Sequence, residues 1–216
     1  MSYWNLNARD PISSMTHFWG AVISLAGTLI LAIQLLSGGA GEKKTVSVMI
    51  FGTSLVALYA CSSLYHFVKT TPARTLRLRK LDHAMIYVLI AGTYTPILLN
   101  YLQGEKALWM TALIWIIGLA GVTLMLLWFS MPRWLSTLFY LAMGWFLVYD
   151  LDALRAMEPG AIALLVIGGI FYTIGGIIYA LKKPNILQHL GFHEIFHIFV
   201  LLGSAFHFLA ISLYVI

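Results

Sequence analysis

The chain has 216 residues, of which 61% are hydrophobic and only 10% are charged. Because a typical soluble domain carries about 25% charged residues, this composition excludes an ordinary water-soluble domain and indicates an integral membrane protein. The net charge of +5 does not indicate nucleic-acid binding, since the basic residues stand in short segments between apolar runs. The single cysteine, Cys61, excludes an intramolecular disulfide bond.

Seven apolar stretches have lengths close to the roughly 20 residues that an α-helix needs to cross a bilayer. We therefore expect an all-α fold, a bundle of seven transmembrane helices that forms a single domain (1–216) in the cell membrane. The fifth stretch is the shortest, and glycine and proline residues separate the stretches. The predicted spans are His17–Leu36, Thr45–Val68, Leu81–Leu102, Ala107–Phe129, Leu135–Asp150, Gly160–Leu181 and Phe192–Ile216.

Lysine and arginine residues are distributed unequally between the two sides that seven spans define. Of the 13 such residues, nine fall on the side of the N-terminus, and four fall on the other side, namely Lys43, Lys44, Lys106 and Arg155. Short cytoplasmic connections are enriched in Lys and Arg. The sequence therefore predicts a cytoplasmic N-terminus and a C-terminus outside.

The last span begins with two histidines, His193 and His197, spaced four residues apart. On a helix this spacing places both imidazoles on one face, one turn apart, which suits two ligands of one metal ion. The predicted topology places the end of the second span, at His66, and the start of the third span, at Asp82, at the same depth in the membrane as these two histidines. We therefore expect these four residues to lie together.

Three neutral imidazoles with an open fourth position are the usual ligands of a catalytic zinc ion. His66, His193 and His197 supply three imidazoles, and Asp82 can hold the water at the fourth position or orient a ligand. Ser62 lies one turn before His66 on the same helix face, so we expect its hydroxyl at the same site. Bound zinc lowers the pKa of a water ligand to about 7 and polarises a carbonyl.

Each of these residues also has an ordinary structural interpretation. His193 and His197 can be polar residues at a helix end, and His66 can be an interfacial side chain. Asp82 is favourable in the first turn of a helix, and Ser62 can be a small packing residue in a membrane bundle. Only their expected proximity favours a metal site over these alternatives.

His207 needs a separate interpretation, because it lies about 21 Å along the helix axis from His193 at 1.5 Å per residue. We expect it to stay outside the metal site, either as a packed, hydrogen-bonded histidine or as part of a polar path. A haem would need a second histidine at the same depth on another helix, and the other histidines lie toward the cytoplasmic ends.

Several motifs in the chain occur together in a known family. The chain contains Ser62-Ser-Leu-Tyr-His66, Leu81-Asp82-His83 and His193-Glu-Ile-Phe-His197. Together they resemble the progestin and adipoQ receptor family, and the resemblance covers nearly the whole chain. The opening run, Arg9-Asp10-Pro11-Ile12-Ser13-Ser14-Met15-Thr16-His17, resembles the bacterial, hemolysin III-like branch, which usually has Glu in place of Asp10 and Asn in place of Ser14.

The resemblance implies seven transmembrane helices, an intracellular N-terminus and a zinc ion near the cytoplasmic face, bound by His66, His193 and His197. It also implies that Asp82 contacts the water on the zinc ion and that Ser62 lies near the site. Animal members are receptors linked to ceramide hydrolysis, and the wider group includes alkaline ceramidases. The bacterial branch is named for haemolysis and is associated with membrane-lipid homeostasis.

Two functions are compatible with these features. The first is a membrane-embedded, zinc-dependent hydrolase that acts on an amide or ester bond of a small lipid substrate, with membrane lipid as its partner. The second is a non-enzymatic sensor, receptor-like protein or cytolysin whose zinc is structural. A fourth protein ligand such as Glu194 would favour structural zinc, but its position next to His193 predicts that it points away.

Overall fold

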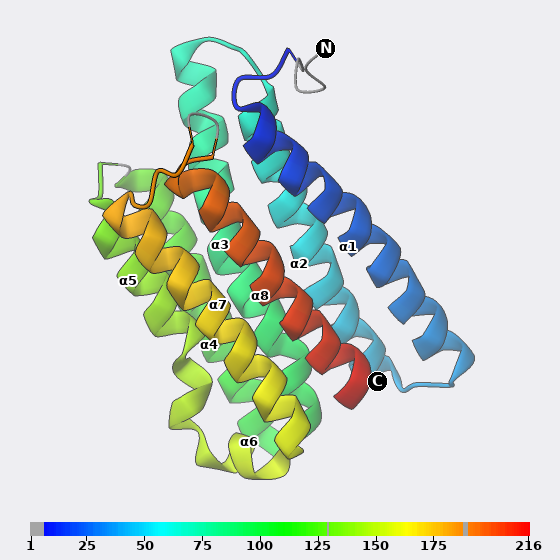
Figure 1. The fold of residues 1–216 in the computed structure, drawn as a ribbon. Coiled ribbons are helices and arrows are strands. Elements are labelled where there is room, and N and C mark those ends of the chain that lie inside the picture. The colour runs from blue at the N-terminus through cyan, green and yellow to red at the C-terminus, as the bar shows by residue number, and fades with distance from the viewer. Residues whose placement is uncertain (1–6, 129, 188–189) are drawn as a thin grey trace.

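The helices of this chain pack side by side into one elongated bundle in the computed structural model (Figure 1). The structure describes residues 7–128, 130–187 and 190–216, and within these ranges the only β-structure is an isolated bridge between Leu187 and Leu190. The predicted all-α fold is confirmed. The predicted end of the fourth span, Phe129, lies outside the described residues.

Six helices in the described part of the chain are long and apolar enough to cross a membrane. They correspond to six of the seven predicted spans. In Figure 1, α1 begins at the end of the bundle where α2 finishes, and α8 finishes at the opposite end. The six helices are α1 (Pro11–Ser37), α2 (Glu42–Phe67), α3 (Pro72–Tyr101), α4 (Gly104–Leu127), α7 (Pro159–Leu181) and α8 (Phe192–Tyr214).

Two of these helices begin well before the predicted spans, and proline explains both starts. Pro11 opens α1 and Pro72 opens α3, where the fixed φ of proline suits the first turn and its missing N–H costs nothing. Thr71 caps α3, because its side chain accepts a hydrogen bond from the backbone of Arg74 at 3.5 Å. The basic run that precedes Leu81 is therefore a helical extension of α3 rather than a loop.

The predicted fifth span is covered by two short elements, α5 (Arg133–Gly144) and a 3₁₀ helix (Phe146–Tyr149), and a third, α6 (Leu151–Ala156), follows it directly. In Figure 1 they follow one another from one end of the bundle to the other. With 12 residues, α5 is shorter than a continuous helix that crosses a bilayer. Seven crossings therefore remain a prediction.

A side chain of α3 forms hydrogen bonds with the backbone where the helical structure breaks after α5. The hydroxyl of Tyr94 donates a hydrogen bond to the carbonyl of Gly144 at 2.7 Å and accepts one from the amide of Leu147 at 2.9 Å. These bonds replace backbone bonds that a continuous helix would make, so the break carries no unpaired group at these two positions.

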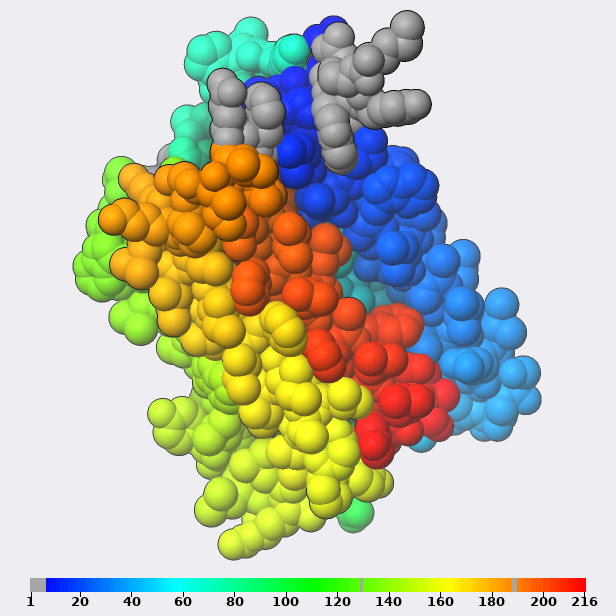
Figure 2. All heavy atoms as spheres, viewed as in Figure 1, coloured from blue at the N-terminus to red at the C-terminus, as the bar shows by residue number. Residues whose placement is uncertain are grey.

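The outer surface of α1 carries large apolar side chains. Ile23, Ile33 and Leu36 are 68%, 66% and 73% exposed. Figure 2 shows α7 (yellow) and α8 (red) side by side on the face turned to the viewer, with α1 (blue) at the edge of the molecule. Such an apolar exterior suits contact with lipid chains rather than with water.

Hydrogen bonds tie the first turn of α1 to the last turn of α2 and the first turn of α8. The amide of Asp10 donates to the carbonyl of His66 at 2.9 Å, and the Ser13 hydroxyl donates to Glu194 at 3.0 Å. Ser14 and Ser63 exchange side-chain bonds with each other's carbonyls at 3.2 and 3.0 Å. This end of the bundle holds the predicted site residues.

Candidate metal centre

The structure brings together the three histidines that the sequence predicts as a group. His66 lies in the last turn of α2, and His193 and His197 lie in the first two turns of α8. Each offers one ring nitrogen, and these nitrogens all lie within 4.8 Å of one another. His66 and His197 are 2% and 1% exposed, whereas His193 is half-buried.

The spacing of the ring nitrogens fits a bound transition metal. The Nε2 atoms of His66 and His193 are 3.2 Å apart. Two nitrogens that each bind a tetrahedral zinc ion at 2.0–2.1 Å stand about 3.3 Å apart. Imidazole also suits copper, iron and nickel, so this ligand set defines a class of metal rather than one element.

Asp82 and Ser62 lie beside the histidine group. Both line the same cavity as His193 and His197. The Asp82 carboxylate interacts with the side chain of Ser62 and stands 3.5 Å from Nδ1 of His83. Asp82 is not a member of the metal-binding group found among the described residues. It therefore lies next to the three histidines without being one of the candidate ligands.

Glu194 does not join the histidines, as its sequence position predicts. One carboxylate oxygen accepts the hydrogen bond from Ser13, and the other accepts from the amide of Gly191 at 2.9 Å. The second bond caps the first turn of α8, where a carboxylate also offsets the helix dipole. Among the described residues, the group that can bind a metal is therefore limited to three histidines.

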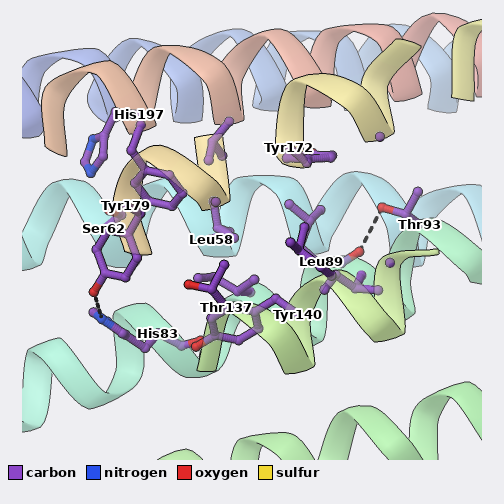
Figure 3. A pocket seen from close by; sticks show the side chains of 18 of the residues that line it. Leu58, Ser62, His83, Leu89, Thr93, Thr137, Tyr140, Tyr172, Tyr179 and His197 are labelled. Carbon is purple, nitrogen blue, oxygen red and sulfur yellow. Dashed lines mark hydrogen bonds between the residues drawn. The ribbon is translucent and has the colours of Figure 1, made fainter. Parts of the chain in front are cut away.

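A cavity extends from the histidine group along the inside of the bundle (Figure 3). Figure 3 shows Ser62 and His197 at one end and Thr93 and Tyr172 at the other. Most of its lining is apolar or aromatic. Residues that contribute to it include Leu58, Ile86, Leu89, Ile90, Tyr140, Trp145, Phe196 and Val200.

His207 lies far from the metal-binding group, as predicted. It lines the cavity near Thr93 and Tyr172, and its Nε2 donates a hydrogen bond to the carbonyl of Leu165 at 3.1 Å. A Cβ atom on Gly168 would meet its ring at less than van der Waals distance. His207 is therefore a packed, hydrogen-bonded histidine at the contact between α7 and α8.

Two residues near the group were not predicted as site residues. The Asp10 carboxylate lies 2.9 Å from Nδ1 of His66. This hydrogen bond holds the pKa of the Asp10 carboxyl below its usual value; partial burial opposes the shift, and the neighbouring Arg9 adds to it. The His17 ring stacks on His197 with centroids 3.7 Å apart and planes 11° apart.

A signal for Asp10 and His17 exists in the sequence. Both belong to the opening motif, and Pro11 marks a helix start between them. A helix that begins at Pro11 places His17 in its second turn, inside the bundle rather than at its edge. Because the predicted first span begins at His17, the sequence prediction places Asp10 and His17 at the edge of the bundle rather than beside the histidine group.

Known proteins with similar sequences cover nearly the whole chain. A family model described as Haemolysin-III related matches residues 6–208. The chain is 37% identical to the hemolysin-3 homolog of Bacillus subtilis over 95% of this chain and 94% of that protein. It is 34% identical to hemolysin-3 of Bacillus cereus over 96% of this chain and 92% of that protein. The human monocyte to macrophage differentiation factor is 28% identical over 92% of this chain and 81% of its own length.

Proposed function

We propose, since this chain belongs to the Haemolysin-III-related family of multi-pass membrane proteins, that it binds zinc and hydrolyses an amide or ester bond of a membrane lipid. In this proposal the chain acts as one domain (1–216) in the cell membrane. Its reaction resembles that of a ceramidase and serves membrane-lipid homeostasis.

The observation that carries this proposal is the position of the histidine group at one end of an apolar cavity. His193, His197, Asp82 and Ser62 all line that cavity. A lipid whose chain lies along the apolar part would bring its polar linkage to these side chains. Pockets of this kind, with few polar groups at one end, orient ligands by the position of those groups.

The residues have distinct roles in the proposed reaction. His66, His193 and His197 hold the zinc ion through ring nitrogens that face one another. When bound, zinc polarises a carbonyl and lowers the pKa of a coordinated water to about 7. Asp82 accepts the proton of the attacking water at a carboxylate oxygen and returns it to the leaving group. Ser62 orients the Asp82 carboxylate through its hydroxyl.

The proposal includes seven crossings with a cytoplasmic N-terminus. The nine-to-four distribution of Lys and Arg supports this orientation. The joint path of α5, the 3₁₀ helix and α6 along the bundle supports a seventh crossing. The metal site then lies in the cytoplasmic half of the membrane, within reach of lipids in the inner leaflet.

The alternative is a sensor, a receptor-like protein or a cytolysin in which zinc only links α2 to α8. The name of the Bacillus cereus relative, hemolysin-3, favours the cytolysin. A purely structural zinc usually has four protein ligands. Both carboxylate oxygens of Glu194 are engaged elsewhere, which supports the hydrolase.

Lipid turnover tests the proposal directly. Purified protein, loaded with zinc or stripped by a chelator, is incubated with a panel of ceramide-like amides and ester lipids in mixed micelles. The proposal expects release of free fatty acid by the zinc-loaded protein only. Turnover that is equal after zinc removal, or no turnover of any lipid by a fully zinc-loaded protein, would reject the hydrolase.

A further inference from the structure

We propose that Asp10 is a positioning residue of the metal site, because its carboxylate fixes the tautomer and the orientation of His66. The inference rests on the proposed zinc site, and it gives a role to the opening motif of the chain, which the hydrolase alone does not use. It concerns binding of the metal rather than a chemical step.

The tautomer of His66 follows from its contact with Asp10. The two side chains meet at 2.9 Å between Nδ1 and a carboxylate oxygen. A carboxylate only accepts hydrogen bonds, so Nδ1 carries the proton and Nε2 keeps a lone pair in the neutral ring. That Nε2 is the atom that faces His193. Metal-binding histidines almost always donate their second N–H to a carboxylate, a carbonyl or water in this way.

The Asp10 carboxylate is itself held in place. Arg9 approaches the same oxygen through Nε and a terminal nitrogen, each at 2.9 Å, and its guanidinium lies 4.0 Å above the ring of Tyr65. Backbone amides of Arg9 and Asp10 donate to the carbonyls of Phe67 and His66 at 3.2 and 2.9 Å. Asp10 is thus fixed to the last turn of α2 by its main chain and by its side chain.

The same segment also contacts a ligand on α8. His17 stacks flat on His197, and the Thr16 hydroxyl lies 3.5 Å from Nδ1 of His197. Residues 9–17 therefore contact metal-binding histidines on both helices that supply them. Asp10 contributes the contact with the strongest directional requirement, because it involves a charged acceptor.

The competing interpretation is that the contact between Asp10 and His66 only fastens α1 to α2. The two interpretations differ in what the loss of Asp10 changes. A fastening contact contributes to the stability of the metal-free protein. A positioning contact contributes to zinc affinity and to the protonated nitrogen of His66, because without the carboxylate the proton is free to move to Nε2.

Zinc affinity of the purified full chain, measured by competition with a chromophoric chelator, separates them. Asp10→Ala should weaken zinc binding by about 10–100-fold, and Asp10→Glu, which keeps a carboxylate, should restore most of that loss. Asp152→Ala is the matched control, since Asp152 forms an ion pair with Lys106 at 2.6 Å at the opposite end of the bundle. Its zinc affinity should equal that of the wild type.

Two further measurements complete the test. Thermal unfolding of the metal-free proteins should show little difference between Asp10→Ala and the wild type. Nitrogen-15 NMR of labelled metal-free protein should show the Nδ1-protonated form of His66 in the wild type and its loss in Asp10→Ala. Asp10→Leu, which has a side chain of similar shape but no hydrogen-bond acceptor, replaces the alanine variant if the latter does not fold.

The outcomes are distinct. Wild-type zinc affinity in Asp10→Ala or, where that variant does not fold, in Asp10→Leu overturns the inference and leaves the zinc site intact. A lower unfolding temperature of the metal-free variant with unchanged zinc affinity identifies a fastening contact and also overturns it. Absence of zinc binding by the wild type itself rejects the proposed metal site, and with it the inference.

Discussion

The Nε2 atoms of His66 and His193 face each other at 3.2 Å, although 127 positions separate the two residues in the chain. Because Nδ1 of His66 contacts the Asp10 carboxylate, its Nε2 presents a lone pair to the other imidazoles. The contact joins the end of α2 to the start of α8. A metal ion at this point would connect the first and last parts of the fold.

The first prediction is one zinc ion per chain, lost when any of the three histidines is removed. His66→Ala, His193→Ala and His197→Ala should each lose most of the metal, because two remaining imidazoles do not complete a site. Metal analysis of protein purified without added chelator measures this. His207→Ala is the matched control and should keep the metal, because His207 lies on the same helix outside the group. Full zinc content in His66→Ala would remove α2 from the site.

The second prediction concerns the break after α5. Tyr94→Phe removes the hydroxyl that pairs with Gly144 and Leu147. A typical hydrogen bond contributes about 0.5–1.5 kcal/mol, so the loss of two should lower the free energy of unfolding by about 1–3 kcal/mol in total. Chemical unfolding in detergent measures it. Tyr149→Phe is the control, since Tyr149 is 84% exposed, and an equal loss in both variants would contradict the role of Tyr94.

The third prediction concerns orientation. Reporter fusions after Thr75 should lie in the cytoplasm, and fusions after Lys43 and Ile216 should lie outside. The physical reason is the excess of Lys and Arg on the side of the N-terminus. A cytoplasmic signal from the Ile216 fusion would mean an even number of crossings, so that α5, the 3₁₀ helix and α6 together would not cross.

The six long helices and the proximity of the three histidines could be predicted from the sequence. Apolar runs of sufficient length identify spans, and counting spans brings His66 and His193 to one end of the bundle. Because consecutive spans alternate in direction, hydrophobicity alone predicts that these two residues lie at one end of the bundle although they are far apart in the chain.

The continuity of the fifth span could not be predicted in the same way. Residues 135–150 are apolar enough for one helix, but the break depends on the Tyr94 hydroxyl, which α3 supplies. The same holds for Asp10, whose partner His66 lies on another helix. Hydropathy shows where a segment lies but not which polar groups it meets.

The last prediction tests Asp82, which distinguishes the hydrolase from a protein with structural zinc. In the hydrolase, Asp82 does not bind the metal but accepts a proton from the attacking water. Asp82→Asn keeps all three histidines, so zinc content should stay near that of the wild type. Loss of a general base typically costs about 10²–10⁴-fold in rate, so turnover of a suitable lipid amide should nearly vanish.

The measurement combines zinc content with fatty-acid release for the wild type, Asp82→Asn and Asp152→Asn. Asp152, which is 67% exposed at the other end of the bundle, provides a change of the same chemistry that should leave turnover unchanged. If zinc is structural, Asp82→Asn should alter stability modestly and weaken zinc binding by about 10–100-fold, as for other outer partners of metal ligands. A variant that keeps both its zinc and its full turnover would show that Asp82 is not the base, because no proton acceptor would have been lost.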